Sequence, residues 1–146
     1  FIMPGNSLAY EWQSYIPISH YPKIVNPKHG YVSSANERAT DKSYPYYYHQ
    51  FYAESYRNRR INQVLSELTK IDDKAMMRLQ NDNYNLAAKE NLGFLLGYLE
   101  VSKLDTQQQQ AYQTLLDWNL LNEADQVAPS IFRAWQDQLS DILWSS

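Results

Sequence analysis

The sequence contains no cysteine, and this absence narrows the chemistry that its 146 residues can carry. Without thiols there is no disulfide framework, no cysteine nucleophile and no cysteine-ligated zinc site. The absence fits a reducing and an oxidising compartment equally, so it assigns no location.

A surplus of positive charge and a long apolar run are also missing. The net charge is -3, which argues against a nucleic-acid-binding protein because such proteins normally carry a basic surplus. No apolar run approaches the roughly 20 residues that cross a bilayer, and no signal-peptide pattern is present. We therefore expect no membrane span and no nucleic-acid partner. The sequence starts at Phe1 without an initiator Met, and we expect it to be a single fragment, residues 1–146, of a larger protein.

Proline and tyrosine concentrate in the first third of the chain. Residues 1–52 alternate short apolar runs with proline and glycine, which predicts short strands and loops. Residues 31–35, "YVSSA", form the best candidate strand, and residues 26–30, "NPKHG", predict a turn before it. We expect this segment to line a site.

From about residue 53 the apolar spacing becomes helical, so residues 53–146 are predicted to form a helical subdomain of four or five helices. The first helix carries Ile61, Val64, Leu65 and Leu68; Asp72 or Asp73 caps the second, and Asp105 or Thr106 caps the fourth. The last helix begins near Pro129, with an expected inner stripe of Ser130, Ile131, Ala134, Trp135, Leu139, Ile142 and Leu143. Gly93 and Gly97, in the third helix, predict close helix packing. The predicted fold class is mainly α.

Several polar residues have a simple structural interpretation. His20, His29 and His49 lack the spacing of a metal motif, so we interpret them as loop residues. Residues 80–83, "QNDN", resemble a calcium loop faintly, but they lack its glycine and closing glutamate and predict a turn. The tyrosines of residues 44–48 are expected to pack their rings, although they could also stack on sugars or bases.

Asn36 and the arginines near residue 60 leave two alternatives open. Asn36 follows the candidate strand, where its amide could stabilise an oxyanion or simply favour a turn. Arg57, Arg59 and Arg60 form either a solvated helix face or a cluster with one member turned inward.

An ordered series of motifs resembles the β-chain of the penicillin acylase (penicillin amidase) family, whose members are N-terminal-nucleophile hydrolases. The segments are "PGNSLAYEWQSYIPISHYPKIVNPKHGYVSSANE", "YRNRRINQVL" and "LLDWNLLNEADQVAPSIFRAW". The matching positions are Trp12, Ile16, Pro17, Asn26, Pro27, Gly30, Ala35, Asn36, Tyr44, Pro45, Arg60, Ile61, Gln80 and Asp82. The resemblance covers essentially the whole chain.

The resemblance implies a role for two residues. Asn36 matches the asparagine that donates its amide to the tetrahedral oxyanion, and Arg60 matches an arginine that positions the N-terminal residue and that asparagine. The family nucleophile is a serine, sometimes cysteine or threonine, at the start of the processed β-chain, and its α-amine is the base. That residue would precede Phe1, so we expect the isolated fragment to be inactive.

The resemblance also implies the surroundings of the fragment. The parent would be an αββα enzyme that hydrolyses a side-chain amide of penicillin-like or other N-acyl compounds. Its α-chain and remaining β-chain would be the partners of this fragment, the location would be periplasmic or otherwise exported, and the cut fragment would be prone to self-association. No cofactor is expected. Some relatives hold a structural calcium, but the corresponding position here is Tyr48, and Glu37 and Asn119 also depart from the family pattern.

An alternative function needs no parent enzyme. Aromatic residues make up 14% of the chain, and such residues dominate protein-protein contact sites. The chain could therefore be a stand-alone helical interaction module with an aromatic contact surface.

Overall fold

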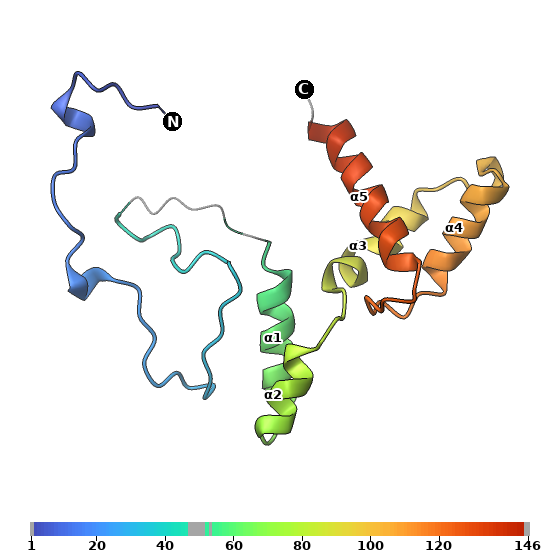
Figure 1. Ribbon diagram of the computed structural model, residues 1–146, viewed down its shortest axis with the longest axis horizontal. Coiled ribbons are helices and arrows are strands. Elements are labelled where there is room, and N and C mark those ends of the chain that lie inside the picture. Colours follow the sequence, from blue (N-terminus) through green and yellow to red (C-terminus); the bar gives the residue numbers. More distant parts are fainter. Residues whose placement is uncertain (1, 47–51, 53, 145–146) are drawn as a thin grey trace.

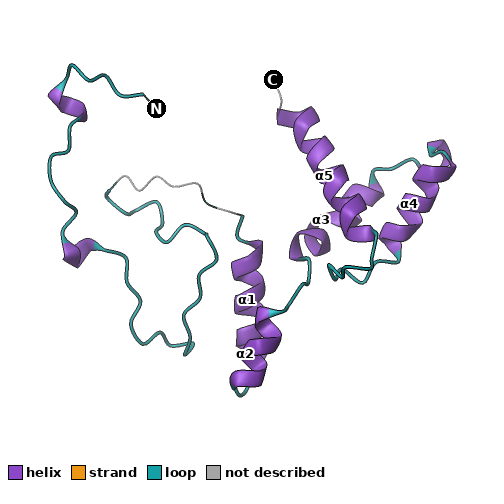
Figure 2. Ribbon diagram, in the orientation of Figure 1, coloured by secondary structure: helices purple, strands orange, loops and turns teal. Residues whose placement is uncertain are grey.

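The computed structural model describes residues 2–46, 52 and 54–144, and in these residues it contains helices and loops but no strand (Figures 1 and 2). An extended segment of residues 2–46 is followed by five α-helices, and the predicted mainly α class is confirmed. The helices are α1 (Tyr56–Glu67), α2 (Asp73–Gln80), α3 (Leu86–Gly97), α4 (Thr106–Leu116) and α5 (Ala128–Trp144). No described helix is long and apolar enough to cross a membrane.

The N-terminal segment holds two short 3-10 turns, Leu8–Tyr10 and Ile18–His20, and no regular ladder. The predicted turn at residues 26–30 is present, with Gly30 N–H donating to the Pro27 carbonyl at 2.9 Å and Gly30 at φ 79°. The predicted strand at residues 31–35 is wrong for this chain. A strand forms only when its backbone groups pair with a neighbouring strand, and the described residues supply none.

Helix α2 begins where local chemistry predicts. Asp72 is the N-cap of α2 and accepts from Ala75 N–H at 2.9 Å, as the sequence predicted. Leu65 of α1 and Ala75 of α2 are buried, so both helices turn one apolar edge away from water. The capping prediction for α4 is also confirmed, because Asp105 and Gln108 form a complete capping box.

The apolar core lies among α3, α4 and α5. Phe132 is its most buried large side chain, at 1% exposure, and its ring centroid lies 5.7 Å from that of Trp118. The other buried members are Ala88, Leu92, Leu96, Leu115 and Ala128. These three helices therefore form the part of the chain with a true hydrophobic interior.

The predicted inner face of α5 is only partly right. Ile131 and Trp135 pack against the core, whereas Ile142 and Leu143 are 77% and 59% exposed. The prediction also omitted Phe132, the residue that the helix buries most completely. Figure 1 shows the reason, since the C-terminal half of α5 extends away from α3 and α4.

The two glycines of α3 do not make close helix packing, so that prediction is wrong. A Cβ atom at Gly93 or Gly97 would meet no atom of the described residues within 4 Å. Both residues are exposed.

A short clasp joins the start of α3 to the loop after α4. Asn85 N–H donates to the Leu120 carbonyl at 2.8 Å, and Asn122 N–H donates to the Asn83 carbonyl at 3.0 Å. Leu120 has φ 65°, a left-handed conformation that is unusual for a bulky side chain. The hydrogen bonds of Leu120 and Asn122 to residues 83–85 therefore stabilise the strained turn at Leu120.

Candidate functional site

Asn36 lies at a sharp bend of the N-terminal segment, with its side chain exposed. Its φ is 64°, in the left-handed region that asparagine tolerates better than most residues. The carboxylate of Glu37 stabilises the bend, because it accepts a hydrogen bond from Ala35 N–H at 2.7 Å. Glu37, which departs from the family pattern, thus fixes the local backbone beside Asn36.

Arg57 of α1 binds the side chain of Asn36 directly. Its Nη2 donates to Asn36 Oδ1 at 2.7 Å and to the Ala35 carbonyl at 3.3 Å. Arginine carries donors only, so the amide atom that faces it must be the oxygen. Among the described residues Asn36 Nδ2 has no hydrogen-bond partner, and the amide therefore offers its NH₂ group outward.

A polar ladder fastens the chain before Asn36 to the same helix. Asn58 Nδ2 donates to Ser33 Oγ at 3.2 Å, and Ser33 Oγ donates to Asn62 Oδ1 at 3.3 Å. Tyr31 adds a third contact, with its hydroxyl donating to the Asn62 carbonyl at 3.2 Å. Asn58 and Asn62 are one helical turn apart, so they face the segment together.

Arg60, the second predicted site residue, binds Asp82 rather than Asn36. Its Nη2 lies 2.7 Å from Asp82 Oδ2, its Nε lies 3.1 Å from Oδ1, and its guanidinium lies 4.6 Å from the centroid of the Tyr84 ring. The side chains of Arg60 and Asp82 are 24% and 18% exposed. The hydrogen bond from Arg60 lowers the pKa of the Asp82 carboxyl, so this pair is ionised over the neutral range.

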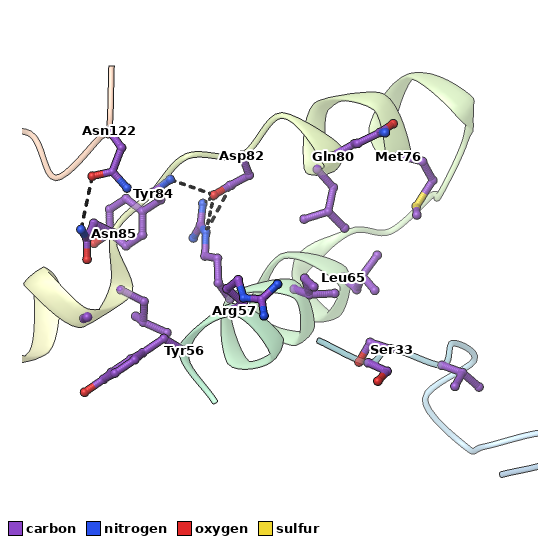
Figure 3. Close-up of a pocket in the computed structure, with 17 residues that line it drawn as sticks. Ser33, Tyr56, Arg57, Leu65, Met76, Gln80, Asp82, Tyr84, Asn85 and Asn122 are labelled. Carbon is purple, nitrogen blue, oxygen red and sulfur yellow. Dashed lines mark hydrogen bonds and ion pairs between the residues drawn. The ribbon is translucent and has the colours of Figure 1, made fainter. Parts of the chain in front are cut away.

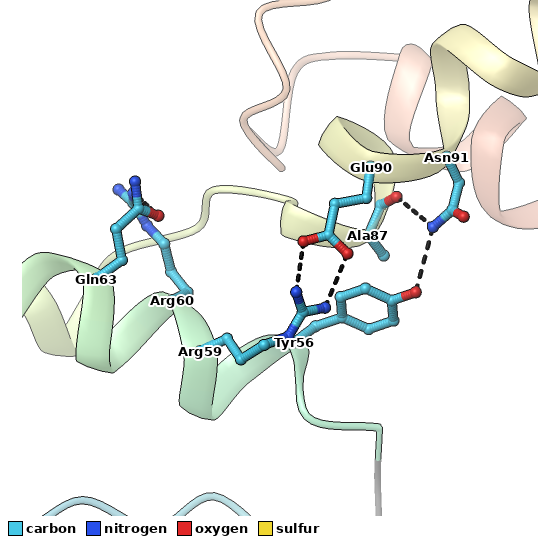
Figure 4. Close-up of polar contacts among 7 residues, drawn as sticks. All are labelled: Tyr56, Arg59, Arg60, Gln63, Ala87, Glu90 and Asn91. Carbon is cyan, nitrogen blue, oxygen red and sulfur yellow. Dashed lines mark hydrogen bonds and ion pairs between the residues drawn. The ribbon is translucent and has the colours of Figure 1, made fainter.

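Arg59 faces a different partner from Arg57 and Arg60. It forms a two-pronged ion pair with Glu90 of α3, and Tyr56 beside it accepts from Asn91 Nδ2 at 3.2 Å (Figure 4). The three arginines of α1 therefore have different partners. Arg57 binds the Asn36 bend, Arg60 binds the loop after α2, and Arg59 binds α3.

An open cleft of about 720 Å³ lies between this N-terminal segment and the helices (Figure 3). Ser33 and Ser34 of the N-terminal segment line the cleft, and so do the apolar side chains Ile61 and Leu65 of α1. Arg57 lines the cleft, whereas Asn36 does not itself form its wall. The cleft is large enough for a drug-sized molecule.

The other polar candidates behave as loop residues where they are described. His20 Nδ1 lies 2.6 Å from the Tyr46 hydroxyl, and His29 packs edge-on against Tyr31 with ring centroids 4.5 Å apart. Asn81 ends α2 in a turn, as expected for residues 80–83. His49 and Tyr48, the position discussed for calcium, lie outside the described residues.

No group of three histidine, aspartate or glutamate side chains gathers in the described part of the chain. Asp82, the acid nearest the cleft, already has Arg60 as its partner.

The comparison with protein families identifies the group to which these motifs belong. The sequence profile of the penicillin amidase family matches residues 1–146. The chain belongs to the penicillin amidase family. The resemblance seen in the sequence is thereby confirmed over the full length.

One curated relative is "Penicillin acylase 2 proenzyme" from Pseudomonas sp. (strain SE83), with 26% identity over 145 residues. The match covers 97% of this chain and 18% of that relative. No solved structure matches the chain significantly.

Within this penicillin amidase segment, two motif positions that the sequence matched separately meet in space. Arg60 and Asp82 come from different motifs and form one ion pair. Sequence reasoning missed Arg57, Asn58 and Asn62 as the residues that hold the Asn36 bend. The four-residue spacing of the two asparagines was the available signal, because it places both on one helical face.

Proposed function

We propose that the chain is one segment of a longer amidohydrolase that cleaves a side-chain amide of penicillin-like or other N-acyl compounds. The family match over residues 1–146 carries this proposal. The chain spans only 18% of the relative it matches, so the activity belongs to the longer protein and not to this segment. The rest of that enzyme would be the partner of this segment.

The exposed surface supports a segment over a stand-alone module. The chain exposes 12349 Å², whereas a folded monomer of its 17.2 kDa exposes about 7,800 Å². Large apolar side chains contribute to this area: Trp12, Tyr15 and Ile18 of the N-terminal segment are each more than 80% exposed. A chain that acts alone would bury such side chains, because water-exposed apolar surface opposes folding and solubility.

In the proposed mechanism, the side-chain amide of Asn36 stabilises the oxyanion. A hydroxyl at the N-terminus of the processed chain attacks the amide carbonyl, and the neighbouring α-amine takes its proton. The carbonyl oxygen becomes an anion and accepts from Asn36 Nδ2. Collapse of the tetrahedral species breaks the C–N bond, the amine leaves with the proton, and water then hydrolyses the acyl-enzyme ester.

Arg60 would contribute to the site as an anchor. Its ion pair with Asp82 fixes α1 against the loop after α2, and Arg57 lies one turn earlier on the same helix. We expect the isolated 146-residue segment to hydrolyse no N-acyl substrate, because it spans only 18% of the length of the relative that it matches. The exported location remains a prediction from the resemblance.

The test is substitution of Asn36 in the full-length enzyme. Asn36→Gly removes the amide but keeps a residue that accepts φ 64°. The matched control is Asn26→Gly, at the other exposed asparagine of this segment with positive φ. Turnover of acyl p-nitroanilides with aromatic and aliphatic acyl groups is measured per processed chain.

Asn36→Gly is expected to lower kcat by about 10²–10³, the usual cost of losing one oxyanion donor. Asn26→Gly is expected to leave kcat near that of the unmodified enzyme. Normal turnover by Asn36→Gly would remove Asn36 from the mechanism. Absence of amidase activity from the unmodified, processed enzyme across the substrate panel would refute the function itself.

A further inference from the structure

We propose that the C-terminal half of α5 is the docking surface for a helix of the longer enzyme that lies outside residues 1–146. The inference rests on the proposed function in one respect, since it requires the chain to be a segment of that enzyme. It adds which face the rest of the enzyme covers and what kind of element covers it. The observation that carries it is an apolar seam on α5 of which the described residues bury only the first half.

The seam has the spacing by which one helix pairs with another. Apolar residues recur along α5 at alternating intervals of four and three residues, at Ala128, Phe132, Trp135, Leu139 and Ile142. An average repeat of about 3.5 residues keeps these side chains on one narrow stripe, which is the usual contact surface between two helices. The sequence of α5 therefore fits a helical partner along its whole length.

The structure covers this seam unevenly. Ala128 and Phe132 are buried, and Trp135 packs against the core formed with α3 and α4. Two turns later Ile142 is 77% exposed, and Leu143 beside it is 59% exposed. In Figure 1 this end of α5 extends away from α3 and α4. The second half of the seam is thus continuous with the core, but the described residues leave it open to solvent.

The polar residues of α5 agree with a covered seam. Arg133 and Asp137 form an ion pair on the opposite side of the helix, with Nε and Oδ2 2.9 Å apart and with both side chains exposed. The residues that flank the second half of the seam, Gln136, Gln138 and Leu143, carry no charge. A helix along the seam would therefore desolvate no ionised group, and burial of an unpaired charge is costly. The occupant is accordingly expected to present an apolar, uncharged stripe.

A second copy of the chain is a poorer occupant than a helix of the same enzyme. Leu139, Ile142 and Leu143 each offer about 60–120 Å² of apolar side-chain area, so two copies would bury roughly 400–700 Å² through these residues. A specific interface between two proteins buries about 1,200 Å² or more. A helix of the same enzyme needs less area, because its connection to α5 makes the contact intramolecular. This segment covers 18% of the relative that it matches, so an enzyme of that length has ample chain to supply the helix.

Photo-cross-linking in the full-length processed enzyme tests the inference. The variants are Leu139→p-benzoylphenylalanine and Ile142→p-benzoylphenylalanine, with Asp137→p-benzoylphenylalanine on the opposite face as the matched control. An equal mixture of isotopically light and heavy enzyme is irradiated, so that cross-links within one molecule are told from cross-links between two copies.

The two seam positions are expected to cross-link within one molecule to a peptide outside residues 1–146. The residues captured from positions 139 and 142 should lie three, four or seven apart, the spacing of one helical face. The control at position 137 should give at least about tenfold fewer such cross-links, because its side chain faces water.

Hydrogen exchange gives a second measurement without the bulky probe. In the full-length enzyme, Ile142→Ala is expected to speed exchange of the last two turns of α5 about tenfold or more, because it removes buried contacts. Asp137→Ala removes only an exposed ion pair and is expected to change this exchange by about threefold or less.

Four results would each overturn the inference. They are cross-links from Ile142 no more frequent than from Asp137, cross-links confined to residues 1–146, cross-links between two copies, and captured residues two apart, as on a strand. Unchanged exchange in Ile142→Ala would do the same if the probe variants do not fold. None of these readouts is turnover, so their failure leaves the proposed amidase activity standing. An enzyme that gives the expected cross-links but has no amidase activity would refute the proposed function alone.

Discussion

Arg60 and Asp82, which lie 22 residues apart, are joined by two nitrogens of one guanidinium and both oxygens of one carboxylate. Tyr84 covers the same guanidinium, and its own N–H donates to Asp82 Oδ1 at 3.1 Å. A single arginine thus organises the connection between α2 and α3. Because the side chains are largely shielded from water, this pair is worth more than an exposed one.

We expect the Arg60–Asp82 pair to protect the amides of α1 from hydrogen exchange in a pH-dependent way. The pKa of Asp82 is lowered in the folded chain, chiefly by the hydrogen bond from Arg60. Its stabilising contribution is therefore complete above the unfolded pKa of about 4 and is lost as the pH falls through the lower folded value. Hydrogen exchange of α1 should be faster in Asp82→Asn than in the unmodified protein at pH 6.

That difference should shrink as the pH is lowered below about 4, because the unmodified Asp82 then becomes protonated too. Comparison at each pH cancels the intrinsic pH dependence of exchange. Asp125→Asn, at an exposed acid of the loop before α5, serves as the control. A difference that stays constant down to pH 2 would show that the ionised pair does not stabilise α1.

Among substitutions in the core, that of Phe132 is expected to cause the largest loss of local stability. It is 1% exposed and contacts the Trp118 ring, so Phe132→Ala removes apolar contacts and leaves a cavity. The expected cost is about 3–5 kcal/mol, read from the exchange of α3, α4 and α5 amides. Ile142→Ala, on the exposed end of the same helix, should cost no more than about 0.5 kcal/mol within this segment.

Substitutions of Gly93 and Gly30 by alanine are expected to change stability in opposite directions. Gly93 lies inside α3 with open space at its Cβ position, so Gly93→Ala should stabilise the helix by about 0.5–1 kcal/mol. Gly30 also has open space, but its φ of 79° strains any other side chain. Gly30→Ala should therefore destabilise the turn at residues 26–30. Exchange of the α3 and turn amides in the full-length protein measures both, and destabilisation by Gly93→Ala would reveal a neighbour at that position.

Local chemistry was readable from the sequence, and pairing between distant segments was not. Each cap was narrowed to two adjacent residues, of which Asp72 and Asp105 are the caps in the structure, because a cap needs only the next three residues. The strand at residues 31–35 was not confirmed, because a strand depends on a partner that no local pattern specifies. Alternating "YVSSA" letters are equally compatible with an extended segment tied down by side chains, as observed here.

The same limit applies to the candidate site. Asn36 and Arg60 were selected through their place in an ordered series of motifs, but the partner of each arginine could not be read in this way. Arg57 and Arg60 are three residues apart and share one helical face, so spacing gives both equal access to the segment before α1. Only the three-dimensional arrangement shows that Arg57 binds Asn36 and Arg60 binds Asp82.

The clasp between residues 83–85 and 120–122 has a further consequence. Because backbone hydrogen bonds join its two ends, the arm made of α3, the 3-10 turn Val101–Lys103 and α4 leaves and returns to the same place. Residues added or deleted at the exposed tip of this arm would alter its reach without displacing α2 or α5. We therefore expect relatives to differ in length mainly at that tip, because added or deleted residues there do not change the geometry of the rest of the enzyme.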